Sequence, residues 1–79
     1  MTVSQAVTAR IREILAKEEK SLYRLEMDSG LSKGTFNSLM YNRNKSVNLT
    51  TIIVITQTLG ITLEQFFASP LFEQENIDV

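Results

Sequence analysis

The sequence predicts an all-α fold of five short helices, and three observations support this prediction. Apolar residues recur three and four positions apart along most of the chain, which is the spacing of one helical face. Ser, Thr or Asn, the residue types that cap helix N-termini, precede these segments. Gly30, Gly60 and Pro70 stand where segments would end. The length of 79 residues corresponds to one domain.

The first helix is predicted over residues 4–18, with Ser4 as its cap. Its apolar face is formed by Val7, Ile11, Ile14 and Leu15. The opposite face is expected to be solvated and carries Arg10, Arg12, Glu13 and Lys17.

Two short helices are predicted next, over residues 21–29 and 32–41. Ser21 and Ser32 are the expected caps, and Gly30 can end the first of the two by adopting a positive φ. The second has an apolar face of Phe36, Leu39 and Met40. Its other side is polar and carries Lys33, Gly34, Asn37, Ser38 and Tyr41, and a polar loop follows over residues 42–46.

Residues 48–60 are ambiguous when taken alone. Seven consecutive β-branched residues, from Thr50 to Thr56, favour a strand. The length of the segment, a capping Asn48 and a terminal Gly60 favour a helix, which we prefer. The expected apolar stripe of that helix is Leu49, Ile52, Ile53, Thr56 and Leu59.

The last helix is predicted over residues 63–68, after the capping-box pattern of Thr62 and Gln65. An apolar group follows that is large for so small a domain, and part of it is expected to remain exposed as a dimerisation surface. This group consists of Phe66, Phe67, Leu71 and Phe72. We therefore divide the chain into a domain at residues 1–72 and an acidic, flexible tail at residues 73–79.

The chain contains no Cys and no His, which excludes disulfides, thiol nucleophiles and imidazole chemistry. No metal site, cofactor or catalytic constellation can be assembled from the remaining residue types, so we expect no enzyme. No apolar run approaches the length of a membrane span, and the first ten residues do not resemble a signal peptide. We expect a cytoplasmic protein associated with the nucleoid.

The net charge of −1 does not by itself indicate a nucleic-acid partner, but its distribution does. Residues 46–79 contain four acidic residues and no basic one. The middle of the chain is positive, because Glu26 and Asp28 are outnumbered there by Lys20, Arg24, Lys33, Arg43 and Lys45.

The strongest motif is a pair of short helices joined by a tight turn. Gly30 permits the turn, Leu31 fills the angle between the helices, and Ser32 caps the second helix. This arrangement is a helix-turn-helix, which presents the polar face of its second helix to the major groove of DNA.

On these residues the chain resembles the λ-repressor/Cro-like family of helix-turn-helix regulators, also called the XRE family. The resemblance covers about residues 9–67 and is clearest in the stretches SGLSKGTFNSL and TLGITLEQFF. It implies a five-helix λ-repressor-like bundle, in which residues 48–60 are helical. It also implies a Cro/C1-type transcriptional regulator that binds palindromic operator DNA as a homodimer, and we expect a repressor.

The expected DNA-binding residues lie on the second helix of the motif and in the loop after it. Lys33 and Asn37 can reach base edges, and Thr35 matches a family position that often contacts phosphate. Gly34 allows a close approach of the backbone. The full expected set is Lys33, Gly34, Thr35, Asn37, Ser38, Tyr41, Arg43 and Lys45.

Four positions depart from the family pattern and leave an alternative open. Leu22 replaces a common glutamine that contacts phosphate, and Glu26 replaces a common alanine between the helices. Lys20 and Val47 stand where leucine and proline are common. The low net charge, the missing glutamine at Leu22 and the apolar group near the C-terminus motivate a second hypothesis, a protein-interaction module on the same fold, such as an anti-repressor or an antitoxin-like partner.

Overall fold

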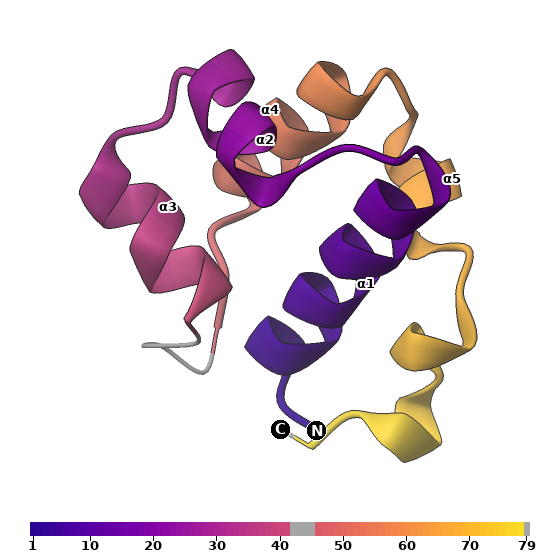
Figure 1. The fold of residues 1–79 in the computed structure, drawn as a ribbon. Coiled ribbons are helices and arrows are strands. Elements are labelled where there is room, and N and C mark those ends of the chain that lie inside the picture. The colour runs from indigo at the N-terminus through magenta and orange to yellow at the C-terminus, as the bar shows by residue number, and fades with distance from the viewer. Residues whose placement is uncertain (42–45, 79) are drawn as a thin grey trace.

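The computed structural model describes residues 1–41 and 46–78, and it confirms the all-α, five-helix fold (Figure 1). Two short 3-10 helices, η1 and η2, follow the five α-helices. The α-helices are α1 (Val3–Lys17), α2 (Leu22–Ser29), α3 (Lys33–Met40), α4 (Leu49–Leu59) and α5 (Leu63–Phe67). The 3-10 helices are η1 (Pro70–Phe72) and η2 (Gln74–Asn76).

The sequence identified four of the five helix starts correctly. In each case the capping side chain accepts a hydrogen bond from a backbone N–H in the first turn, which would otherwise lack a partner. These caps are Ser21, Ser32, Asn48 and Thr62. Gly30 and Gly60 end α2 and α4 in the left-handed conformation, with φ of 71° and 74°.

The predicted start of α1 at Ser4 is wrong. The cap is Thr2, whose side chain accepts from the N–H of Gln5 at 3.1 Å. The Gln5 side chain in turn accepts from the N–H of Thr2 at 2.8 Å, which completes a capping box. Ser4 lies inside the helix and is buried.

The core is built by one face of every α-helix. α1 supplies the predicted Val7, Ile11, Ile14 and Leu15, all buried. Leu25 of α2, Phe66 of α5 and the predicted face of α3 pack into the same cluster. Burial of this continuous apolar surface is the main term that stabilises so small a domain.

The predicted buried stripe of α4 is partly wrong. Leu49 is 58% exposed, and Ile53 is half-buried. The buried face is instead Ile52, Ile55, Thr56 and Leu59, in which the spacings of three and four residues form one regular helical stripe.

The expected solvated face of α1 also needs a correction. The Arg10 side chain is 18% exposed, and it reaches the end of α5. Its Nε donates to the carbonyl of Phe66 at 2.7 Å, and its Nη2 donates to the carbonyl of Gln65 at 2.9 Å. Glu13 pairs with the same guanidinium. Arg10 therefore joins α1 to α5.

After α5 the chain returns along α1, and the two termini lie side by side (Figure 1). Thr2 and Asp78 form an isolated parallel bridge, and the N–H of Asp78 donates to the carbonyl of Met1 at 2.7 Å. The flexibility expected of residues 73–79 stays a prediction, although Asp78 makes these contacts.

Candidate nucleic-acid interface

The helix-turn-helix is formed by α2, a turn at residues 30–32, and α3. The hydroxyl of Ser29 stabilises the turn by accepting from the N–H of Leu31 at 3.2 Å and donating to the carbonyl of Glu26 at 3.0 Å. Ser32 then caps α3 by accepting from the N–H of Thr35 at 3.1 Å. Half-buried Leu31 packs against the core between the two helices. The angle between α2 and α3 is thus fixed by both hydrogen bonds and packing.

α3 is held firmly on its inner side. Phe36, Leu39 and Met40 are buried with exposed fractions of 2%, 6% and 2%. The hydroxyl of Thr8 on α1 donates to the carbonyl of Leu39 at 3.1 Å. Because its inner face is anchored in this way, α3 presents its outer face in a fixed orientation.

The outer face of α3 consists of the predicted DNA-binding residues that the structure describes. Lys33, Gly34, Thr35 and Tyr41 are exposed, whereas Asn37 and Ser38 are half-buried. Tyr41 is the C-cap of the helix and is 62% exposed. The predicted Arg43 and Lys45 lie outside the described residues.

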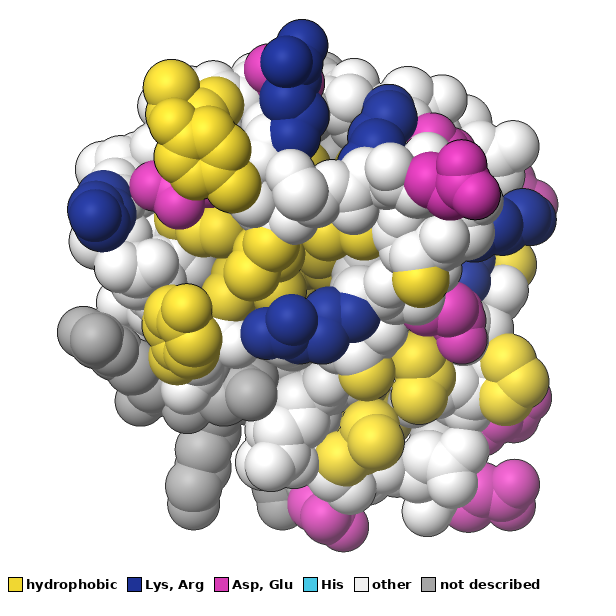
Figure 2. Space-filling model, viewed as in Figure 1, with side chains coloured by type: hydrophobic (Ala, Val, Ile, Leu, Met, Phe, Trp, Pro, Cys, Tyr) yellow, Lys and Arg dark blue, Asp and Glu magenta, His cyan; other side chains and the backbone are white. Residues whose placement is uncertain are grey.

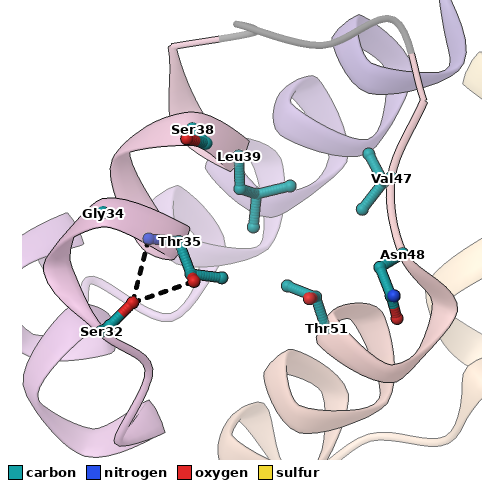
Figure 3. A pocket seen from close by; sticks show the side chains of 8 residues that line it. All are labelled: Ser32, Gly34, Thr35, Ser38, Leu39, Val47, Asn48 and Thr51. Atoms are coloured by element: carbon teal, nitrogen blue, oxygen red, sulfur yellow. Dashed lines mark hydrogen bonds between the residues drawn. The ribbon is translucent and has the colours of Figure 1, made fainter.

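A surface groove of about 550 Å³ separates α3 from the start of α4 (Figure 3). Figure 3 shows side chains from the two helices on opposite sides of this groove. The lining combines hydroxyl and amide groups with apolar surface, to which Leu39 and Val47 contribute. The lining residues are Ser32, Gly34, Thr35, Ser38, Leu39, Val47, Asn48 and Thr51.

Sequence reasoning predicted only part of this groove. Gly34, Thr35 and Ser38 were expected to contact DNA, but Ser32 and Asn48 were interpreted as helix caps only. Thr51 was missed because its position beside α3 depends on how α4 packs. The available signal was that Asn48 and Thr51 are three residues apart, and therefore share one face of a helix.

The charges near the motif are partly neutralised by neighbours. Arg24 pairs with Asp28 one turn along α2 at 2.9 Å, and Lys20 pairs with Glu18 at 3.4 Å. Within residues 1–41 and 46–78, Lys33 forms no ion pair. Lys33 is thus the basic side chain of α3 whose charge is available to an anionic partner.

One face of the molecule shows how the side chains are distributed (Figure 2). Hydrophobic side chains line the floor of a central hollow, with Lys and Arg around and above it. Acidic side chains occur at several places on this face, including the lower right, where the C-terminal segment runs in Figure 1. The segment after α5, which packs against α1, therefore lies on the opposite side of α1 from α3 in this view (Figure 1).

The residues predicted for dimerisation separate into inner and outer members. Phe66 is completely buried and closes the core, so it presents no free surface to a partner. Phe67 is 37% exposed, and Leu71 and Phe72 are half-buried. The Phe67 and Phe72 rings meet edge to face with centroids 4.8 Å apart.

Two features are absent from the part of the chain that the structure describes. No group of three or more Asp or Glu residues there is placed to hold a metal ion. No helix among these residues is long and apolar enough to cross a membrane.

The fold and the site together define a helix-turn-helix DNA-binding domain. Residues 10–69 match the family model of the Cro/C1-type HTH DNA-binding domain, and the chain belongs to that family. The crystal structure of the prophage Lp1 protein 11 has the same fold, with a TM-score of 0.81 and 28% sequence identity. The alignment covers 92% of this chain and 97% of that one. No curated protein is detectably similar to the chain.

Proposed function

We propose that the chain is a sequence-specific transcriptional regulator, acting as a repressor, that inserts α3 into the major groove of operator DNA. The observation that carries this proposal is the outer face of α3. Its side chains are polar and either exposed or half-buried, on a helix whose inner face is buried in the core. A helix used for reading base edges needs this combination of rigid support and free polar groups.

Each residue of that face has a proposed role. The Asn37 amide offers the donor and acceptor pair that matches adenine, and the Lys33 ammonium can donate to guanine or phosphate. The hydroxyls of Thr35 and Ser38 face the groove beside α4 and can donate to phosphate oxygens (Figure 3). Phosphate contacts position the domain, and base contacts then supply the sequence preference. Arg43 and Lys45 are proposed as further phosphate contacts.

We further propose that the chain binds a palindromic operator as a homodimer. Phe67, Leu71 and Phe72 offer an apolar surface beside the core, on the C-terminal part of the chain. Two-fold symmetric dimers are the commonest assembly, and they match the symmetry of palindromic sites. Such a regulator acts on cytoplasmic DNA by binding alone, and we propose no catalytic role.

A second candidate is a protein-interaction module on the same fold. Tyr23 and Met27 lie one turn apart on α2 and are 70% and 60% exposed. Exposed apolar side chains at this spacing suit a protein partner better than a phosphate backbone. Such a module would bind a protein tightly and would not change the electrophoretic mobility of DNA.

Selection from a random duplex library separates the two candidates. The wild type is compared with a Lys33→Ala/Asn37→Ala variant at two salt concentrations, because phosphate contacts weaken steeply as salt rises. We expect a palindromic motif that the variant no longer selects. For a dimer that neutralises six to eight phosphates, the log–log slope of affinity against salt is about −5 to −7.

The matched control for this selection is Arg12→Ala, at an exposed position of α1. It removes a positive charge without touching α3 and is expected to keep the selected motif. Absence of enrichment for the wild type at either salt concentration would contradict the proposed function and favour the protein-interaction module.

A further inference from the structure

The glycine in the first turn of α3 is not required by the fold. Gly34 is exposed, and its φ lies outside the left-handed region that Gly30 and Gly60 adopt. Apart from its two chain neighbours and the adjoining backbone of α3, a Cβ atom built at Gly34 meets no atom of the described residues within 4 Å. Neither backbone conformation nor crowding inside the chain therefore excludes a larger residue at this position.

Glycine at this position weakens the helix. It loses more backbone freedom on folding than any other residue, and alanine is the better helix former. Gly34 thus lowers stability without relieving a contact among the described residues. Its role is therefore expected in a contact with another molecule. Gly34 lies on the rim of the groove between α3 and α4, on the face proposed to meet DNA (Figure 3).

We infer that Gly34 carries no side chain because bound DNA occupies the space that a Cβ atom would fill. The inference rests on the proposed function and deepens it. The backbone of the first turn of α3 then comes into van der Waals contact with the DNA. Gly34 thereby sets how deeply α3 enters the groove, and whether Lys33 and Asn37 reach the base edges.

The neighbours of Gly34 agree with a close approach. Thr35 and Ser38, which line the groove together with Gly34 on α3, are short and uncharged. A Cβ atom at position 34 would add bulk to this face and hold the helix away from the duplex. Gly34 is in this sense a positioning residue, which acts on specificity through the depth of insertion.

Gly34→Ala and Gly34→Leu test the inference through two separate measurements. The first is the melting temperature without DNA, which we expect to rise by about 2–5 °C in Gly34→Ala because alanine stabilises the helix. The second is the affinity for the duplex that the wild type selects. We expect it to fall by about 10- to 100-fold in Gly34→Ala, as when extra atoms enter a close-packed contact, and further in Gly34→Leu.

Two comparisons make the test specific. Binding to an unrelated duplex depends mainly on phosphate charge, so both variants are expected to change it less than binding to the selected duplex. Gln57→Ala, at an exposed position near the other end of α4, is the control for adding alanine to a helix and is expected to leave affinity unchanged.

The outcomes separate the inference from the proposed function. If the wild type selects a motif and Gly34→Leu binds it equally well, the inference is overturned and the proposed function stands. A melting temperature that falls in Gly34→Ala also overturns the inference, because the fold itself would then need the glycine. If the wild type selects no DNA at all, both are overturned.

Discussion

At the scale of single residues, Arg10 has a larger structural role than its place on the polar face of α1 suggests. Its guanidinium donates to two carbonyls at the end of α5, and Glu13 pairs with it. The last carbonyls of a helix have no partner within the helix, so an external donor stabilises them. One long side chain thus connects the first and last α-helices.

We predict that Arg10→Ala lowers the free energy of unfolding by about 1–3 kcal/mol, because it removes charge-assisted hydrogen bonds from a mostly buried site. Urea unfolding followed by circular dichroism measures the change. Arg12→Ala, at the exposed position two residues away, is the control and is expected to stay within about 0.5 kcal/mol of the wild type. Equal stability of the two variants would show that the Arg10 contacts contribute nothing.

At the scale of helices, α4 shows that a β-favouring sequence becomes helical when caps and burial of one face stabilise the helix. Its run of β-branched residues places Ile52, Ile55, Thr56 and Leu59 on the buried face. The caps at both ends and the burial of this face together outweigh the intrinsic preference for a strand.

We predict that Ile55→Ala lowers the free energy of unfolding by about 2–5 kcal/mol, since Ile55 is 1% exposed and its loss leaves a cavity. Leu49→Ala is the matched comparison on the same helix. Because Leu49 is 58% exposed, its truncation is expected to change stability by about 0.5 kcal/mol or less. Thermal unfolding of both variants measures the difference, and a reversed order would mean that α4 is rotated from the orientation described.

How much could be predicted from the sequence depends on whether the signal is local. Gly60 and the caps at Ser32 and Thr62 act on their own helices, and the sequence therefore predicted them. Thr2 and Ser4 are both capping types, and only the glutamine three residues after Thr2 distinguishes them. The capping-box pattern of Thr2 and Gln5 is therefore the local signal that marks the earlier start of α1.

The parts that escaped prediction depend on packing between distant segments. Phe66 and Phe67 are neighbours of the same type, and the rotation of α5 on α1 decides which one is buried. The α4 side of the groove follows in the same way from how α4 packs beside α3. The periodicity of a helix shows which residues share a face, but it does not show which neighbour that face meets.

At the scale of the whole molecule, the helix-turn-helix and the acidic segment after α5 are separate parts of the fold. The helix-turn-helix lies in the first half of the chain, and the segment after α5 returns to the N-terminus. The segment after α5 contains acidic residues and no basic one, which disfavours contact between that segment and a polyanion. A weakly negative protein can thus bind DNA through one locally positive surface.

Sequence-specific reading of DNA by α3 is tested most directly by mapping the face of the protein that contacts DNA. Backbone amide chemical shifts of the ¹⁵N-labelled protein are followed during titration with the selected duplex and, separately, with a scrambled duplex of the same composition. We predict the largest shifts at residues 33–41 and at the start of α4, with the selected duplex only. Shifts confined to residues 66–72, or identical shifts with both duplexes, would contradict sequence-specific reading by α3.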